Sequence, residues 1–412
     1  MSDTAPAPGI HPGTPEFRRM NLALMAGGFA TFAVLYCVQP LLPAFVADFH
    51  HDAASASLAV SLTTGGMAGC LLFTSVLADR MSRRLLMGVS LVSAAILTLF
   101  VAVAPSWPLL LAARALTGLA LSGVPAVALT YVGEEVDGGS IGLAVGMHIS
   151  GNIVGGMAGR LATGVLADHF GWRGAVGAVG ASALVAAILL WVLLPSSRRF
   201  VPRHRTMGAA LAGLAEPFRD RGLPWLFLAG FTCMGAFVTI YNFIGFRLLG
   251  PPYNLSQTVV GLIFTCYLLG VVSSTWVGDL AGRVGRRKVF WATMLAMVVG
   301  VGLTAARPLP LVILGVAVLT VGFFSAHSTA SSWVGRRAGP LRAAASSLYL
   351  FFYYLGGSLV GPLGGLAWGR YGWSGVAVLI ESLLAVGLAV SIGLAFLQPL
   401  PGNEPSAQKT GK

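Results

Sequence analysis

Apolar residues run along the chain in long stretches, which short polar or charged turns separate. A helix of ~20 apolar residues crosses the ~30 Å hydrocarbon core of a bilayer. The pattern therefore predicts an all-α integral membrane protein with twelve spans. The expected spans cover about residues 20–46, 55–77, 85–104, 108–131, 140–166, 174–194, 223–249, 257–280, 288–305, 309–332, 341–367 and 374–397.

The two halves of this pattern repeat each other. The arginine-rich turn at 77–84 returns 203 positions later at 280–287, each time between the second and third span of a half. Other pairs recur at similar offsets: 169–172 with 370–373, 132–135 with 334–337, and Tyr36 with Tyr241. A repeat of this length indicates an internal duplication. We expect a tail at 1–19, six helices in 20–194, a cytoplasmic linker at 195–222, six helices in 223–398, and a tail at 399–412, with both tails disordered and cytoplasmic.

Composition supports a membrane protein, because 56% of residues are hydrophobic and only 10% are charged, against about 25% charged in soluble chains. The net charge of +12 does not indicate nucleic-acid binding, since the basic residues form short clusters between apolar stretches. With the N-terminus in the cytoplasm, 20 of the 26 basic residues fall in inner segments and three in outer ones. The positive-inside rule then places both termini in the cytoplasm.

Several classes of function are disfavoured. The four cysteines lie in apolar runs without CxxC spacing, so no metal site is indicated. The chain has no HExxH motif and no Gly-rich phosphate loop, which argues against an embedded enzyme or an ATP-driven pump. We expect no cofactor beyond a proton gradient, and we expect the protein to be a monomer. A receptor that does not transport remains a remote alternative.

The arginine turns resemble a motif of the major facilitator superfamily, which commonly reads G-x-x-x-D-R-x-G-R-R. The first copy has Ser75 and Ser82 at the glycine positions, and the second has Gly282 at the aspartate position. Residues 36–43 and 151–160 are similar to the YnfM/AraJ-like bacterial efflux carriers. The resemblance implies two pseudo-symmetric six-helix bundles in the bacterial inner membrane, with substrate held between them. It implies proton-coupled efflux of a small amphipathic organic molecule; an uptake carrier or uniporter for a small organic anion is the alternative.

Charged residues at the inner ends of the spans suggest a cytoplasmic gate. We expect an ion-pair network that favours the outward-facing state and loosens when the cavity opens inward, since partly hydrated pairs are worth only about 0–1 kcal/mol each. The alternative is that the arginines only fix topology. The predicted gate residues are Asp79, Arg80, Arg83, Arg84, Glu134, Glu135, Arg283, Arg286 and Arg287.

Ionisable residues within spans are costly and are therefore candidates for function. The structural alternatives are that Arg114 extends its guanidinium to the outer membrane interface and that Arg160 pairs with Asp168, two turns further along. A histidine titrates near neutral pH and could carry a proton. Aromatic faces on spans 1, 7 and 10 suit an amphipathic solute, although such faces also arise from packing. The predicted substrate-binding residues are Tyr36, Gln39, Arg114, Asn152, Arg160, Tyr241, Asn242 and His327, and the proton-coupling candidates are His148, His327, Glu381 and Arg114.

Overall fold

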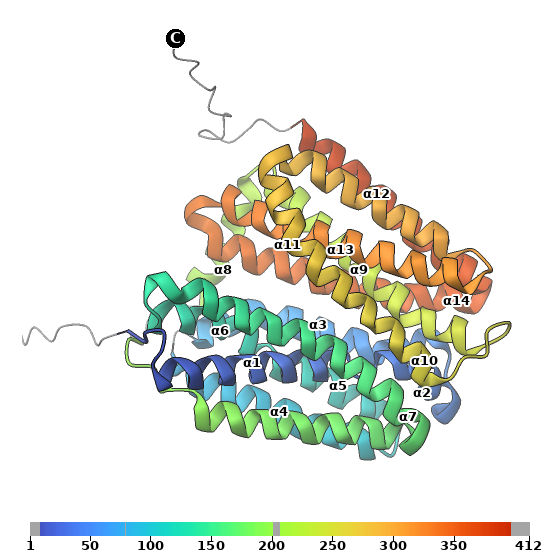
Figure 1. The fold of residues 1–412 in the computed structure, drawn as a ribbon, viewed down its shortest axis with the longest axis horizontal. Helices are drawn as coiled ribbons and strands as arrows, with labels where there is room; N and C mark the ends of the chain where they lie inside the picture. Colours follow the sequence, from blue (N-terminus) through green and yellow to red (C-terminus); the bar gives the residue numbers. More distant parts are fainter. Residues whose placement is uncertain (1–8, 79, 201–206, 397–412) are drawn as a thin grey trace, which may run out of the picture.

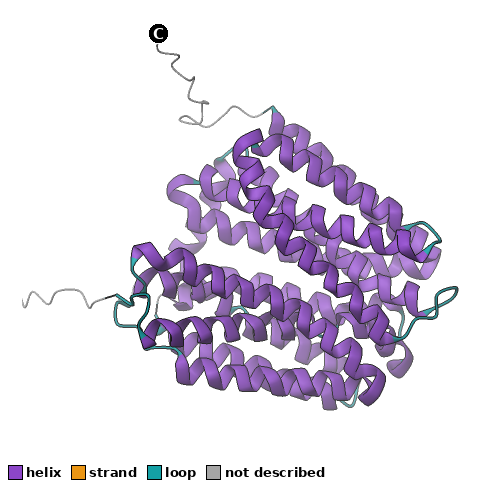
Figure 2. Cartoon of the chain, in the orientation of Figure 1, coloured by secondary structure: helices purple, strands orange, loops and turns teal. Residues whose placement is uncertain are grey.

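The computed structural model describes residues 9–78, 80–200 and 207–396. These residues form α helices and short 3₁₀ turns, and their only β pairing is an isolated bridge between Ile10 and Val136 (Figure 2). The first half of the chain holds α1 (Pro15–Tyr36), η1 (Gln39–Leu41), α2 (Leu42–Phe49), α3 (Ala53–Ala78), α4 (Arg83–Val103), α5 (Trp107–Leu121), α6 (Gly123–Glu135), η2 (Gly138–Ser140) and α7 (Ile141–Leu193). The second half holds α8 (Met207–Ala215), η3 (Glu216–Arg219), α9 (Leu223–Leu249), α10 (Gln257–Leu262), η4 (Ile263–Cys266), α11 (Tyr267–Val284), α12 (Arg286–Thr304), α13 (Leu309–Arg337), η5 (Gly339–Leu341) and α14 (Arg342–Ala395).

Ten helical stretches of the described residues are long and apolar enough to cross a membrane. Two of them, α7 and α14, each contain two helices that meet at a kink. The kinks lie at Gly171 and Gly372, which have φ of 68° and 59°, a region that glycine enters without steric cost. If each is counted as two spans, ten becomes the twelve that the hydropathy pattern predicts. Both glycines come from the repeated segments at 169–172 and 370–373.

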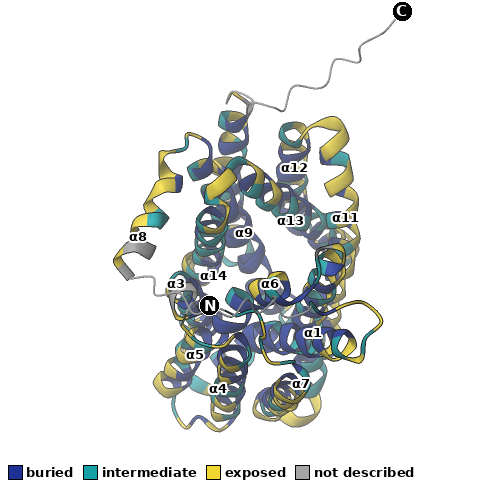
Figure 3. Ribbon diagram, turned by 90° about the vertical axis from the view of Figure 1, so that its left-hand side faces the viewer, coloured by how far each residue is buried: buried dark blue, intermediate teal, exposed yellow. Residues whose placement is uncertain are grey.

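The helices of the two halves gather separately. In Figure 1, α1–α7 (blue to green) occupy one half of the molecule and α9–α14 (yellow to red) the other; we call these the N-half and the C-half. The two halves meet mainly where α3 packs against α14 and α7 packs against α10. Figure 3 shows buried residues gathered towards the inside and exposed ones on the outer surfaces. Large apolar side chains such as Phe170, Val192 and Val272 are exposed there, as expected of surfaces that contact lipid.

Prolines interrupt two spans beside the interior of the molecule. The first span is broken between α1 and α2 by η1, which contains Pro40. The fourth is broken at Ser122, between α5 and α6. Pro125 has no amide N–H to offer to the carbonyl of Leu121, so the helical ladder cannot run through this point.

Glycines let α1 and α7 approach closely. A Cβ added to Gly151 or Gly155 would lie 2.3 or 2.1 Å from the carbonyl oxygen of Met25 or Phe29, and one on Gly159 would lie 2.7 Å from the Cα of Ala33. The four-residue spacing of these glycines places them on one face of the helix. Without side chains at these positions, the backbones of α1 and α7 can come into contact.

The ends of the halves differ from the expected boundaries. Helix α1 begins at Pro15, inside the segment expected as a tail, and the amide of Ile10 donates to the carbonyl of Glu135. The segment expected as a linker contains α8 and η3. Asp220, which follows η3, accepts from the amides of Gly222 and Leu223 and from Arg337. Burial disfavours its ionised form, but the bonds from Arg337 and the two amides outweigh burial and lower the pKa of Asp220. The expected C-terminal tail lies outside the described residues.

Candidate functional site

A cavity of about 460 Å³ lies between the two halves. Its size is within the range of small-molecule sites. The N-half contributes α1, α6 and α7, and the C-half contributes α9, α11, α13 and α14. The side chains that bring polar atoms to its lining are Tyr36, His148, Asn152, Arg160, Tyr267, Ser274, His327, Ser328, Ser331, Tyr353 and Tyr354.

Arg160 brings the one formal charge to this lining, and no aspartate or glutamate is among the lining residues. Its Nε donates to Gln39 Oε1 at 2.6 Å and its Nη1 to the Gly156 carbonyl at 2.6 Å. The guanidinium carbon lies 4.0 Å from the Tyr36 ring centroid and 4.8 Å from that of Tyr267. Such cation–π contacts partly offset the loss of hydration. The Asp168 pairing considered from sequence does not form, because that carboxylate binds α10.

Gln39 links the arginine to the opposite half. Its Nε2 donates to Asn242 Oδ1 at 2.7 Å, while its Oε1 accepts from Arg160. Asn242 lies on α9 and is buried, and its Nδ2 has no hydrogen-bond partner within the described residues. The structure thus joins three residues predicted from sequence, although Gln39 and Asn242 lie behind the cavity lining.

Two histidines line the cavity from opposite halves. His148 Nδ1 lies 3.0 Å from the Leu24 carbonyl oxygen, which can only accept, so the neutral ring carries its proton on Nδ1. His327 Nδ1 lies 2.9 Å from the Tyr349 hydroxyl, and its ring packs 4.5 Å from that of Tyr353. Asn152 lies one helical turn after His148 and also faces the cavity.

Three further predicted site residues do not line the cavity. Arg114 is fully buried, and its Nε, Nη1 and Nη2 donate to the carbonyls of Ala59, Val34 and Leu35. Tyr241 is buried with its hydroxyl 2.8 Å from Thr320 Oγ1. Glu381 is half-buried on the second segment of α14, on the side of Gly302 in α12.

The cavity also contains residues that sequence reasoning did not select. Tyr267 lies on α11, and Tyr353 and Tyr354 lie on α14. These helices correspond to spans 8 and 11, which were not expected to line the cavity. The run of aromatic residues at 351–354 was the available signal, but its orientation depends on how α14 packs.

Contacts between the halves close the cavity at the end where α7 and α14 kink, which we call the Asp168 face. Asp168 on α7 accepts from the amides of Gln257 and Thr258 and from the Thr258 hydroxyl at the start of α10. The Cα atoms of Gly164 and Gly261 also meet there, each within about 3.3 Å of the position of the other's Cβ. The lining extends away from this face, past Leu129 and Ile149.

The predicted gate residues lie at the opposite end, which we call the Arg83 face. Arg83 forms a two-bond ion pair with Glu134, at 2.7 and 3.1 Å. Both residues belong to the N-half, so this pair does not connect the halves. Glu135 instead accepts from the amides of Arg198 and Arg199.

The remaining predicted gate residues are dispersed. Arg84 donates to the Trp191 carbonyl, and Arg283 pairs with Asp279 on its own helix at 2.7 Å. Arg286 Nε is buried without a partner within the described residues. Arg80 and Arg287 are described and have further contacts, and Asp79 lies outside the described residues.

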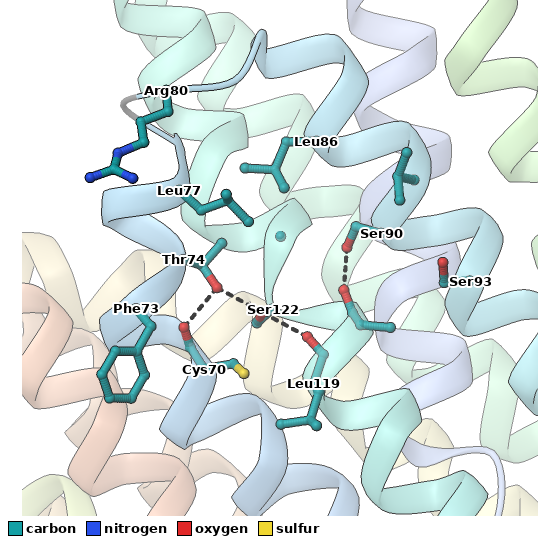
Figure 4. A pocket seen from close by; sticks show the side chains of 13 residues that line it. Cys70, Phe73, Thr74, Leu77, Arg80, Leu86, Ser90, Ser93, Leu119 and Ser122 are labelled. Atoms are coloured by element: carbon teal, nitrogen blue, oxygen red, sulfur yellow. Dashed lines mark hydrogen bonds between the residues drawn. The ribbon is translucent and has the colours of Figure 1, made fainter. Parts of the chain in front are cut away.

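A second hollow of about 430 Å³ lies on the N-half, between α3, α4 and the break at Ser122 (Figure 4). Thr74 and Ser122 share a hydrogen bond of 2.9 Å across it. Phe73, Leu77 and Leu119 are exposed at its rim, so it faces the lipid side of the bundle rather than the space between the halves.

The described residues contain no group of three or more His, Cys, Asp or Glu side chains that could hold a metal ion. Their free cysteines are dispersed: Cys37 follows α1, and the other three lie in α3, α9 and η4.

Comparison with known proteins agrees with this geometry. The family model described as Major Facilitator Superfamily matches residues 24–250 and 233–412. The chain is 44% identical to the inner membrane transport protein YnfM of Escherichia coli over 96% of this chain and 94% of that protein. It is 42% identical to the uncharacterized MFS-type transporter YybF of Bacillus subtilis over 95% of this chain and 97% of that protein.

Solved structures share the fold. A bacterial homologue of the human lysosomal transporter Spinster, in an inward-facing and unoccupied conformation, matches with a TM-score of 0.72 at 15% identity over 93% of this chain and 95% of that one. The nucleoside transporter NupG matches with a TM-score of 0.72 at 14% identity over 92% and 99%. Members of this family move small molecules across membranes and are not enzymes, and they generally need no cofactor. The chain is a multi-pass membrane protein that belongs to the major facilitator superfamily.

Proposed function

We propose that the protein is a secondary active transporter that exports a small amphipathic organic molecule from a bacterium in exchange for protons. The observation that carries the proposal is the cavity between the halves, which inter-half contacts close at the Asp168 face and whose lining extends away from that face. Residues from seven helices of both halves line it, so any relative movement of the halves changes its access. Rocking of residues 20–194 against 223–398, with 195–222 as the linker, would expose it alternately.

The orientation and compartment are part of the same proposal. The Arg83 face carries most of the basic residues, so we place it and both termini in the cytoplasm. The structure then corresponds to an inward-facing state. The related YnfM is named an inner membrane transport protein, and we propose the inner membrane for this chain as well.

Coupling to protons would use the histidines in the cavity. His148 and His327 line the cavity, and imidazole is the side chain whose unperturbed charge change falls near neutral pH, whereas Glu381 and Arg114 do not line it. A proton and the substrate could then bind in turn to one site. The ion pair of Arg83 with Glu134 would hold the ends of α4 and α6 together as the N-half moves.

Transport by the full chain in proteoliposomes under an imposed pH gradient, screened over amphiphilic solutes, tests the proposal. We expect solute flux that reverses with the gradient and stops on addition of a protonophore, and a His327→Gln variant that still moves solute down its own gradient but loses this coupling. Solute flux that ignores the pH gradient would contradict proton coupling. Flux equal to that of protein-free liposomes for every solute would contradict transport.

A further inference from the structure

We propose that the cavity selects organic anions and that Arg160 binds the carboxylate of an amphipathic aromatic acid through Nη2. The inference rests on the proposed function, because it names the substrate class of the same cavity. Nη2 has no hydrogen-bond partner within the described residues, whereas Nε and Nη1 each have one. No Arg160 nitrogen is among the buried side-chain polar atoms that lack a hydrogen-bond partner. The unbonded Nη2 is therefore accessible from the cavity that Arg160 lines.

The other two arginines within the spans show what a structural arginine looks like in this fold. Arg114 directs all three of its nitrogens to backbone carbonyls. Arg247 directs Nη1 to the Thr304 carbonyl and Nη2 to the Ala306 carbonyl and the Tyr253 hydroxyl. Arg160 is the one of the three that keeps a terminal nitrogen available to a solute.

The charge of Arg160 is not neutralised by its surroundings. Among the described residues it forms no ion pair, and its hydrogen bonds go to an amide side chain and a backbone carbonyl, both neutral. A buried cation without a counter-charge is unfavourable even after its hydrogen bonds are made. An anionic solute supplies that counter-charge and can use the planar, bidentate geometry of the guanidinium. A cationic solute would meet repulsion and no carboxylate.

The guanidinium is held in place before any solute binds. Gln39 fixes Nε, and Asn242 of the opposite half fixes Gln39. The ring of Tyr36 packs against the guanidinium plane at 4.0 Å. Such pre-organisation reduces the entropy lost when a carboxylate binds.

The rest of the lining determines the body of the solute. An aromatic wall runs from Tyr267 to Phe237, with ring centroids 5.4 Å apart, and on to Phe323, which stacks on Phe237 at 3.7 Å. It continues to His327 and Tyr353. An aromatic ring system attached to the carboxylate would lie along this wall, since offset and edge contacts between rings are favourable.

Three probes with one ring system and different charge test the inference: naphthylacetate, naphthylacetamide and naphthylethylamine. Their binding to the purified full chain is measured by calorimetry, and their exchange is measured by counterflow in proteoliposomes. In the wild type we expect the carboxylate to bind at least about tenfold more tightly than the amide, and the amine more weakly than either, as charge-assisted hydrogen bonds predict.

Variants then assign the preference to one residue. Arg160→Gln is expected to lower carboxylate affinity at least about tenfold and to leave amide affinity unchanged, and Arg160→Lys is expected to lie between. Arg370→Gln, which changes an exposed arginine outside the cavity, is the matched control and should leave all three affinities unchanged. Size-exclusion profiles establish that each variant is folded, and the comparison of probes on the wild type needs no variant.

Equal or tighter binding of the amide or the amine, no binding of any probe, or a carboxylate preference that survives Arg160→Gln would overturn the inference. These outcomes are distinct from failure of the proposed function. Gradient-driven export of an amine would leave transport standing and remove anion selectivity. Carboxylate binding at Arg160 without any flux would support anion selectivity and contradict transport.

Discussion

Arg114 and Arg160 are both buried in the N-half, but their surroundings give them different tasks. Arg114 ties α5 to carbonyls of α1 and α3 near the break in the first span. The carbonyls of Val34 and Leu35 lie where α1 ends, so Arg114 supplies donors that a helix end otherwise lacks. Arg160 instead keeps a nitrogen for the cavity. We therefore infer that Arg114 has a structural role: it holds α5 against α1 and α3, whereas Arg160 lines the cavity.

Replacing Arg114 with Gln should destabilise the protein by about 2–4 kcal/mol, because a shorter side chain leaves two or more buried carbonyls without donors. Thermal unfolding in detergent measures the loss, with Arg370→Gln as the control. If the Arg114→Gln variant unfolds at the wild-type temperature, the hydrogen bonds of Arg114 do not contribute to stability.

The chemistry of individual residues was predictable from sequence only in part. Intramembrane arginines and histidines are conspicuous in an apolar chain, so Arg160, His148 and His327 could be selected as candidates. Arg114 could not be distinguished from Arg160, because its partners belong to α1 and α3 and meet it only after packing. Tyr267 and Tyr353 were missed for the same reason: a tyrosine in a span has no sequence signal for the side it faces.

At the scale of elements, close helix contacts position the cavity-lining side chains. Helix α1 carries Tyr36, α7 carries Arg160, and the glycine row of α7 sets the distance between them. The hydropathy pattern predicted these helices. It did not predict that the turns at 167–173 and 368–373 would be helical up to a single glycine kink, because hydropathy reports the bilayer crossing and not the geometry of the turn.

Substituting Gly155 with Ala should destabilise the protein by about 1–3 kcal/mol, since its Cβ would lie 2.1 Å from the Phe29 carbonyl oxygen. Gly146→Ala on the same helix is the matched control, because its Cβ would meet nothing within 4 Å. Alanine favours helix there, so that variant should be as stable as the wild type or more so. Equal unfolding temperatures for the two variants would refute the close-contact account.

The link between Asp168 and α10 should set how readily the Asp168 face opens. Asp168→Ala removes three hydrogen bonds between the halves, so we expect the population that is open at this face to rise about tenfold. Spin labels at Phe170 and Tyr371, which are exposed and belong to different halves, report it by pulsed electron resonance in a cysteine-free background. A distance distribution that Asp168→Ala does not change would remove this gate, and Asp168→Asn should fall between the two.

At the scale of the whole molecule, the repeat gives each half a matching long helix that kinks at the same place. Helix α7 turns at Gly171 and α14 at Gly372, and each packs against the other half, α7 on α10 and α14 on α3. The duplication in the sequence predicted this correspondence. The side on which the halves meet could not be predicted, because a transporter sequence must be compatible with more than one arrangement of its halves.

The central claim is that the halves move about the cavity so that one face opens as the other closes. Two label pairs between α7 and α14 measure this directly: Phe170 with Tyr371 at the Asp168 face, and Leu143 with Ala343, both exposed, at the Arg83 face. Distances in nanodiscs, with and without a transported solute and a pH gradient, should change in opposite directions at the two faces. Distances that stay fixed at both faces, or that lengthen together, would contradict alternating access.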